Sequence, residues 1–169
     1  MPENFVLGNN FNTENVTDMS CMFNECKLPN NFSLGNKFNT SNVTRMNSMF
    51  SYCRLPEKFT LGDNFDTSNI VDMFSMFEGC KMSDNFTLGD KFDTSNVKDM
   101  SAMFCLCSSL LELDVSNFNT QNVTDMSSMF NGCSSLVSID VSGFNTSNVT
   151  KMTSMFASCS SLAGIDVSG

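Results

Sequence analysis

The chain has 169 residues, of which 41% are hydrophobic, so it can bury the core of one ordinary domain or of one short repeat array. Its formal net charge is −9, which disfavours nucleic acid and anionic membrane surfaces as partners because both carry negative charge. No apolar run approaches the ~20 residues of a membrane span, and the first residues lack the basic and apolar regions of a signal peptide.

One pattern recurs six times along the chain, with a period of about 27 residues that is typical of a repeat architecture. Each copy has Phe four positions and Thr two positions before an Asn, then Met, a Met-Phe pair and Cys after it. The period shortens by one position in the last two copies. The Asn column consists of Asn15, Asn42, Asn69, Asn96, Asn122 and Asn148.

The first predicted elements are short strands. Residues 32–34, 59–61 and 86–88 alternate apolar and polar side chains and are followed by Gly, and the apolar residues 5–7, also followed by Gly, are interpreted as an opening strand. Residues 113–115, 139–141 and 165–167 keep this alternation with aliphatic side chains in place of Phe. Alternation of this kind predicts half-buried strands, one in each copy.

The second predicted element is a short helix after each strand. From Asn15 to Cys26, apolar residues stand at offsets that trace one face of an α-helix. Asn15 is a suitable N-cap, and Asp18 suits the positive end of a helix. The Asn and Thr columns are thus interpreted as caps and as turn hydrogen bonds between successive coils, and the Met and Phe columns as core.

One unit of this size cannot bury its apolar face alone, so the units must stack. We therefore predict an α/β, curved, leucine-rich-repeat-like solenoid of about six repeats, with one parallel strand and one helix per repeat. Strands pair about 4.8 Å apart and helices pack about 8–10 Å apart, which would place the strands on the concave side. Residues 1–169 are expected to form a single solenoid domain that is part of a longer array, and uncapped ends favour end-to-end self-association.

The segment from Leu110 to Phe118 resembles the leucine-rich-repeat template, with Phe at the position often held by Asn. The fuller string, from Phe-Asn-Thr to Cys-Ser-Ser-Leu, is similar to BspA-like leucine-rich-repeat surface proteins, such as the short repeats of mycoplasma and Listeria-type lipoproteins. The resemblance implies an extracellular or surface-anchored bacterial protein with a role in adhesion or host binding. It implies no catalytic residues.

The cysteines are interpreted as buried, reduced thiols. Successive members of the Cys column are one full period apart, on predicted helices too widely spaced for disulfides, and they lack the clustering of a zinc site. Cys21 stands in a column of small residues and is expected to pack, whereas Cys105 is the thiol we expect to be exposed. Asp63 and Asp90 lie in oxygen-rich turns that could suit calcium, but the calcium-repeat pattern is absent. No metal or cofactor is therefore predicted.

No His is present, and no phosphate loop or dinucleotide fingerprint appears, so we expect no enzyme activity. We expect a protein or glycan to bind the solvent-facing strand side, with a basic partner region near the acidic C-terminal copies. A structural spacer or antigenically variable array without a ligand is the main alternative, and an acid-pair hydrolase is a weaker one. The candidate binding residues are Asn31, Ser33, Lys58, Thr60, Asn85, Thr87, Glu112, Asp114, Ser138, Asp140 and Asp166.

Overall fold

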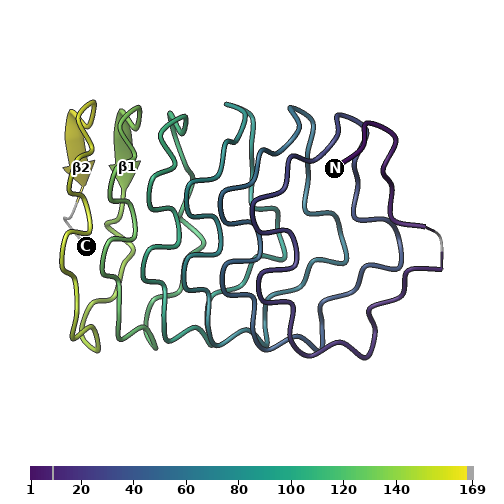
Figure 1. Cartoon of the computed structure of the whole chain (residues 1–169). Helices are drawn as coiled ribbons and strands as arrows, with labels where there is room; N and C mark the ends of the chain where they lie inside the picture. Colours follow the sequence, from purple (N-terminus) through teal and green to yellow (C-terminus); the bar gives the residue numbers. More distant parts are fainter. Residues whose placement is uncertain (9, 167–169) are drawn as a thin grey trace.

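The computed structural model describes residues 1–8 and 10–166, and side chains up to Ile165. The chain winds into flat coils stacked side by side from one end to the other (Figure 1). We number the coils in chain order; the first to the sixth span 5–31, 32–58, 59–85, 86–112, 113–138 and 139–164. The predicted stacking of repeats is confirmed, because hydrogen bonds join each of these coils to the next.

The predicted fold class is wrong in its elements. The described residues contain no helix and only two strands, β1 (Ser138–Asp140) and β2 (Gly164–Asp166), which pair in parallel with Ile139 opposite Ile165. Residues 5–7, 32–34, 59–61, 86–88 and 113–115 form no strand. Residue 167, at the end of the last predicted strand, lies outside the described residues.

Each predicted helix is instead a zigzag of tight turns. In the second coil, the N–H groups of Ser48 and Phe50 donate to the carbonyls of Phe74 and Met76 in the third, at 2.9 and 2.8 Å. The N–H groups between them close local turns, as from Met49 to the carbonyl of Met46 at 3.1 Å. Alternate amides therefore bond to the next coil, as in a β-ladder, whereas every interior amide of a helix bonds within its own segment. We call this side of the solenoid the turn face; it comprises residues 17–28, 44–55, 71–82, 98–109, 124–135 and 150–161.

Backbone conformation explains why these segments are not helical. Ser48 and Tyr52 have φ values of 56° and 53°, in the left-handed region that an α-helix cannot contain. Gly79 and Gly132 occupy the same column as Tyr52, with φ values of 61° and 75°. Two glycines inside a supposed helix are the sequence signal for this conformation.

The side chains interpreted as helix caps instead form hydrogen bonds between coils and local turns. The Asn42 amide donates across coils to the Glu14 carbonyl at 2.7 Å. Asp18 accepts a hydrogen bond from the Ser20 N–H at 2.9 Å, which forms a local Asx turn. The predicted inter-coil bonds of the Thr column are confirmed, since the Thr40 hydroxyl donates to the Asp66 carbonyl at 2.6 Å. Equivalent amide bonds are made by Asn69, Asn96, Asn122 and Asn148.

The core consists of the predicted apolar columns, which run continuously from coil to coil. One ladder of Phe rings stacks through the whole array, with centroids 5.4 Å apart between Phe23 and Phe50 and 5.6 Å apart between Phe130 and Phe156. Stacked aromatic pairs add about 0.5–1.5 kcal/mol each beyond their buried area. The ladder contains Phe23, Phe50, Phe77, Phe104, Phe130 and Phe156.

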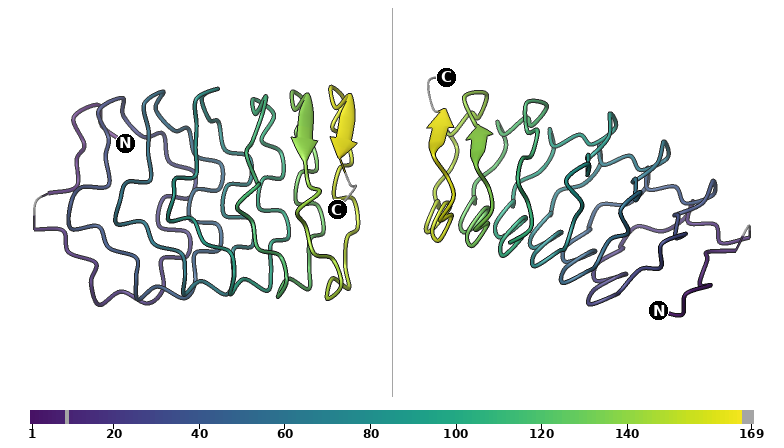
Figure 2. Two further views of the ribbon diagram at one scale, coloured as in Figure 1. Left: turned by 180° about the vertical axis from the view of Figure 1, so that it is seen from behind. Right: turned by 90° about the horizontal axis from the view of Figure 1, so that it is seen from above.

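The opposite side, which carries β1 and β2, is more widely spaced. We call it the strand face; it comprises residues 31–38, 58–65, 85–92, 112–118, 138–144 and 164–166. Here the ring centroids of Phe32 and Phe59 are 6.3 Å apart, and those of Phe38 and Phe65 are 6.5 Å apart. The coils accordingly fan out on this side (Figure 2, right). The predicted placement of the strands on the concave side is wrong, because the turn face is held at ladder spacing by hydrogen bonds.

Candidate interaction surface

The strand face places the predicted binding positions in solvent. Most of its apolar residues are buried and the residues between them are exposed, as in the second coil, where Phe32 and Leu34 flank Ser33. Ten of the eleven candidate positions are exposed: Asn31, Ser33, Lys58, Thr60, Asn85, Thr87, Glu112, Asp114, Ser138 and Asp140. Asp166 lies in β2, and its side chain is outside the described part of the chain.

Much of the strand face is not joined by backbone hydrogen bonds between coils. Within residues 31–36, 58–63 and 85–90, all of them described, no backbone-to-backbone hydrogen bond reaches a neighbouring coil. At the edge of the face, the carbonyls of Lys37, Asn64 and Lys91 accept such bonds from the preceding coil. Along the strand segments themselves, such bonds begin only toward the C-terminal end, where the Val137 N–H donates to the Leu111 carbonyl at 3.1 Å and β1 pairs with β2. The N-terminal coils therefore leave grooves between their strand segments.

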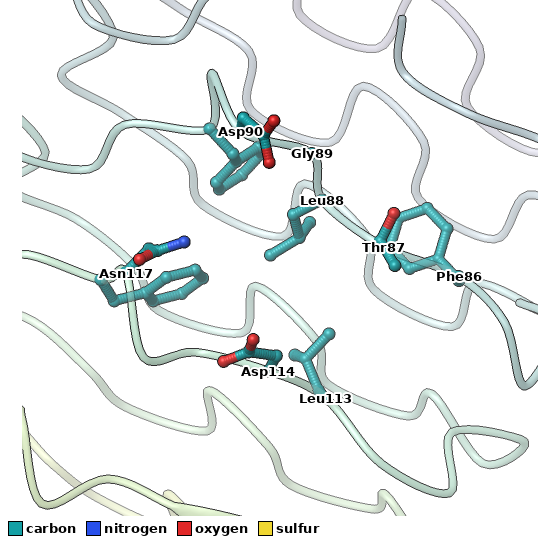
Figure 3. Close-up of a pocket in the computed structure, with 10 residues that line it drawn as sticks. Phe86, Thr87, Leu88, Gly89, Asp90, Leu113, Asp114 and Asn117 are labelled. Carbon is teal, nitrogen blue, oxygen red and sulfur yellow. The ribbon is translucent and has the colours of Figure 1, made fainter.

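The groove between the fourth and fifth coils, which we call the seam slot, has a volume of about 260 Å³. Leu88 and Leu113 form part of its lining, and Asp90 and Asp114 lie on either side of Leu88 (Figure 3). Its full lining is Phe86, Thr87, Leu88, Gly89, Asp90, Phe92, Leu113, Asp114, Asn117 and Phe118.

Two sequence changes at one place account for the seam slot. Phe92 stands six positions after Phe86, whereas Phe118 stands five positions after Leu113, so the turn of the fifth coil is shorter by one residue. Leu113 also replaces the Phe found at this position in the preceding coils, so the outer stack of rings gives way to a smaller side chain. The shortening of the period was visible in the sequence, but its consequence for packing was not.

The carboxylate of Asp114 is oriented by its own turn. Its Oδ1 accepts a hydrogen bond from the Ser116 N–H at 2.9 Å. Hydrogen bonds from the Ser116 side chain and backbone hold the pKa of Asp114 below its ordinary value. Asp114 therefore stays ionised throughout the neutral range.

The sequence did not assign Asp90 and Asn117 to a binding surface. It suggested Asp90 only as a calcium ligand, and it gave no reason to single out Asn117. In the described residues, no group of three or more Cys, Asp or Glu side chains could hold a metal ion. Asp90 instead lines the same slot as Asp114 from the next coil.

Two predictions about individual thiols are wrong. Cys21 is exposed and Cys105 is buried, the reverse of what was expected. The φ of 57° at Cys21 does not explain this exposure, since Ser75 in the same column has a φ of 52° and is buried. The Cys column is reduced, but its members lie on neighbouring coils and not on separate helices, and the Cys107 thiol donates to the Phe77 carbonyl at 3.0 Å.

The backbone of the turn face repeats regularly, and at two places a large side chain packs over a glycine of the next coil. The Tyr52 ring occupies the space that a Cβ on Gly79 would need, since that atom would come within 2.5 Å of the ring. The Tyr52 hydroxyl also donates to Glu78 at 3.0 Å. Leu106 covers Gly132 in the same way, at 2.7 Å. A large residue over a glycine therefore occurs twice in this column.

A comparison of the sequence with known protein families supports the repeat architecture. The family described as "Mycoplasma protein of unknown function, DUF285" matches residues 4–86 and again residues 82–167. The chain belongs to the DUF285 family. No curated protein and no solved structure matches the chain significantly. Across the described residues of this DUF285 chain, no helix is long and apolar enough to cross a membrane.

Proposed function

We propose that this DUF285 chain is a non-enzymatic interaction module of a bacterial cell surface, which binds a protein or glycan through its strand face. The observation that carries the proposal is the separation of the two faces. The turn face is tied from coil to coil by backbone hydrogen bonds, whereas the strand face exposes side chains beside open grooves. The exposed residues of the strand face can therefore vary without changing the stack. The BspA-like resemblance supports a role in adhesion.

The charge of the strand face supports a basic partner region. Candidate positions in the first three coils carry amides, hydroxyls and one Lys, whereas Glu112, Asp114 and Asp140 are exposed acids further along the array. Neither of the two ion pairs in the described residues, Arg45–Asp18 and Lys151–Asp125, involves these acids. Unpaired exposed carboxylates attract basic ligands and steer their approach.

A spacer without a dedicated ligand is the second candidate. The observation that favours it is the uniformity of the turn face, which could extend an array by repetition alone. A spacer does not use one face for binding. Substitutions on the strand face should therefore impair an interaction module but have no special effect on a spacer.

The test is a binding screen of the full chain against extracellular-matrix proteins, host receptors and glycans, followed by charge reversal. The triple variant E112K/D114K/D140K should weaken binding of a captured partner at least about tenfold, because each reversed charge both removes an attraction and adds a repulsion. The matched control, E3K/E14K/E25K, makes the same change in net charge at exposed positions outside the strand face.

Equal loss in both variants would show a general charge effect and contradict the assignment to the strand face. A screen without any partner, together with unchanged surface attachment of both variants, would favour the spacer.

A further inference from the structure

We propose that the seam slot binds an arginine side chain of a protein partner. This inference rests on the proposed function and specifies its chemistry: the ligand is a protein segment that presents one guanidinium to the junction between the fourth and fifth coils. The aliphatic part of the arginine lies on Leu88 and Leu113, and its guanidinium lies between the carboxylates of Asp90 and Asp114.

The size of the seam slot selects a single side chain. Small-molecule and cofactor pockets usually measure about 300–1,000 Å³, and the slot, at about 260 Å³, lies below that range. Its lining combines apolar side chains with carboxylates at the edge. A long side chain with an apolar stem and a charged head matches this arrangement, as in other cases where Arg or Lys covers an apolar surface.

The charge of the seam slot distinguishes it from the neighbouring grooves. Asp90 and Asp114 line it, and no Lys or Arg does. The groove between the third and fourth coils also has two carboxylates, Asp63 and Asp90, but Lys91 is part of its lining. The groove between the second and third coils has the single carboxylate of Asp63, and that between the first and second has Lys37 and no carboxylate.

The aromatic lining favours arginine over lysine. Phe86, Phe92 and Phe118 contribute to the slot. A guanidinium stacks on aromatic faces and can bond to two carboxylates at once through its planar set of donors, whereas an ammonium is a compact and more strongly hydrated charge. A neutral glycan would leave both carboxylates without a counter-charge.

The test measures binding of capped tripeptides to the full ¹⁵N-labelled chain by NMR. The probes are acetyl-Gly-Arg-Gly-amide and its Lys and Gln analogues. We expect the Arg peptide to shift the amides of Leu88, Gly89, Leu113 and Asp114, with weaker binding of the Lys peptide and none of the Gln peptide. The double variant D90N/D114N should weaken binding of the Arg peptide about tenfold, as expected for loss of two partly exposed ion pairs.

Filling the slot is the sharper test. The variant L113F restores the residue type present at Phe32, Phe59 and Phe86, so the fold already accommodates it at this position of a coil. It should abolish binding of the Arg peptide while leaving both carboxylates in place. The matched control E57Q/D84N removes two exposed acids outside the slot and should bind as the unmodified chain does.

Unchanged binding by L113F, equal loss in E57Q/D84N, or equal binding of the Lys or Gln peptide would each overturn the proposal. If the Arg peptide binds but no macromolecule does, the slot stands and the proposed function fails. If a macromolecular partner is found that L113F still binds normally, the proposed function stands and the slot fails.

Discussion

The Cys column shows how single residues support the stack. Three of its four buried thiols donate to a backbone carbonyl of the preceding coil: Cys53 to Phe23 at 2.8 Å, Cys107 to Phe77 at 3.0 Å and Cys133 to Phe104 at 3.1 Å. Burial raises the pKa of both thiols to about 12. Burial also raises the pKa of Cys80 and Cys107 well above the ordinary value. The buried thiols of the column are therefore neutral at physiological pH.

These raised pKa values predict that the protein loses stability in alkali. A thiol titrates near about pH 8.5 in the unfolded chain, whereas Cys53 and Cys133 keep their protons in the fold up to about pH 12. Between these values the unfolded state binds fewer protons, so the free energy of unfolding falls as pH rises, by about 1.4 kcal/mol per pH unit for each thiol. Urea unfolding at several pH values from about 7.5 to about 10.5 measures this slope.

Cysteine variants test whether the buried thiols cause this dependence of the unfolding free energy on pH. C53A and C133A should each flatten it by about 1.4 kcal/mol per pH unit, even though the lost thiol lowers stability near neutral pH. C21A, at an exposed thiol, is the control and should leave the slope unchanged. Parallel pH curves for all the variants would contradict the role of thiol burial.

At the scale of the element, the two faces differ in how their backbone groups are satisfied. On the turn face, the N–H groups of Ser48 and Phe50 bond to the next coil. On the strand face of the third and fourth coils, the N–H groups of Thr60 and Thr87 have no backbone acceptor in the described structure. Amides without an intramolecular acceptor are open to water and exchange readily.

In native-state hydrogen exchange, backbone amides of the turn face should therefore exchange more slowly than those of the strand face. We expect slow exchange for Ser48 and Phe50, and exchange faster by several orders of magnitude for Thr60 and Thr87. Val137 is the internal control: it lies beside the strand face but bonds to the Leu111 carbonyl, so it should be protected. Equal protection of Thr60 and Val137 would show that the N-terminal strand segments pair as a continuous sheet.

Most features that depend on burial could be predicted from the sequence, apart from the exposure of Cys21 and the burial of Cys105, whereas those that depend on backbone bonding could not. Fixed columns identified the repeat, the Phe and Met core, and the exposed positions such as Ser33 and Asp114. The helix was wrong because apolar residues three and four apart point inward both in a helix and in a zigzag of turns. Only the glycines at 79 and 132 favoured the zigzag. The seam slot could not be foreseen, because it depends on how two unlike coils meet.

At the scale of the whole molecule, each coil contacts only its neighbours, so stability is roughly a sum over coils and their interfaces. These interfaces are not all interchangeable. On the turn face, Tyr52 covers Gly79 and Leu106 covers Gly132, so at these two interfaces a large apolar residue in the column is followed by glycine. The order of coils therefore limits which units can be removed.

Two deletions of equal length should differ for this reason. Removal of residues 28–54 places Glu25 next to Gly79, whereas removal of residues 55–81 places Tyr52 next to Leu106, where a Cβ occupies the space that the Tyr52 ring needs. Both proteins retain five coils and the seam slot, but we expect the second to unfold with a free energy lower by about 1–3 kcal/mol, the usual cost of overpacking. Thermal and urea unfolding compare them directly.

Adding Y52G to the second deletion should recover most of the difference, because glycine adopts the positive φ of this position and removes the ring. If the two deletions are equally stable, or if Y52G lowers stability further, stacking in this column does not depend on the alternation of large residues with glycine.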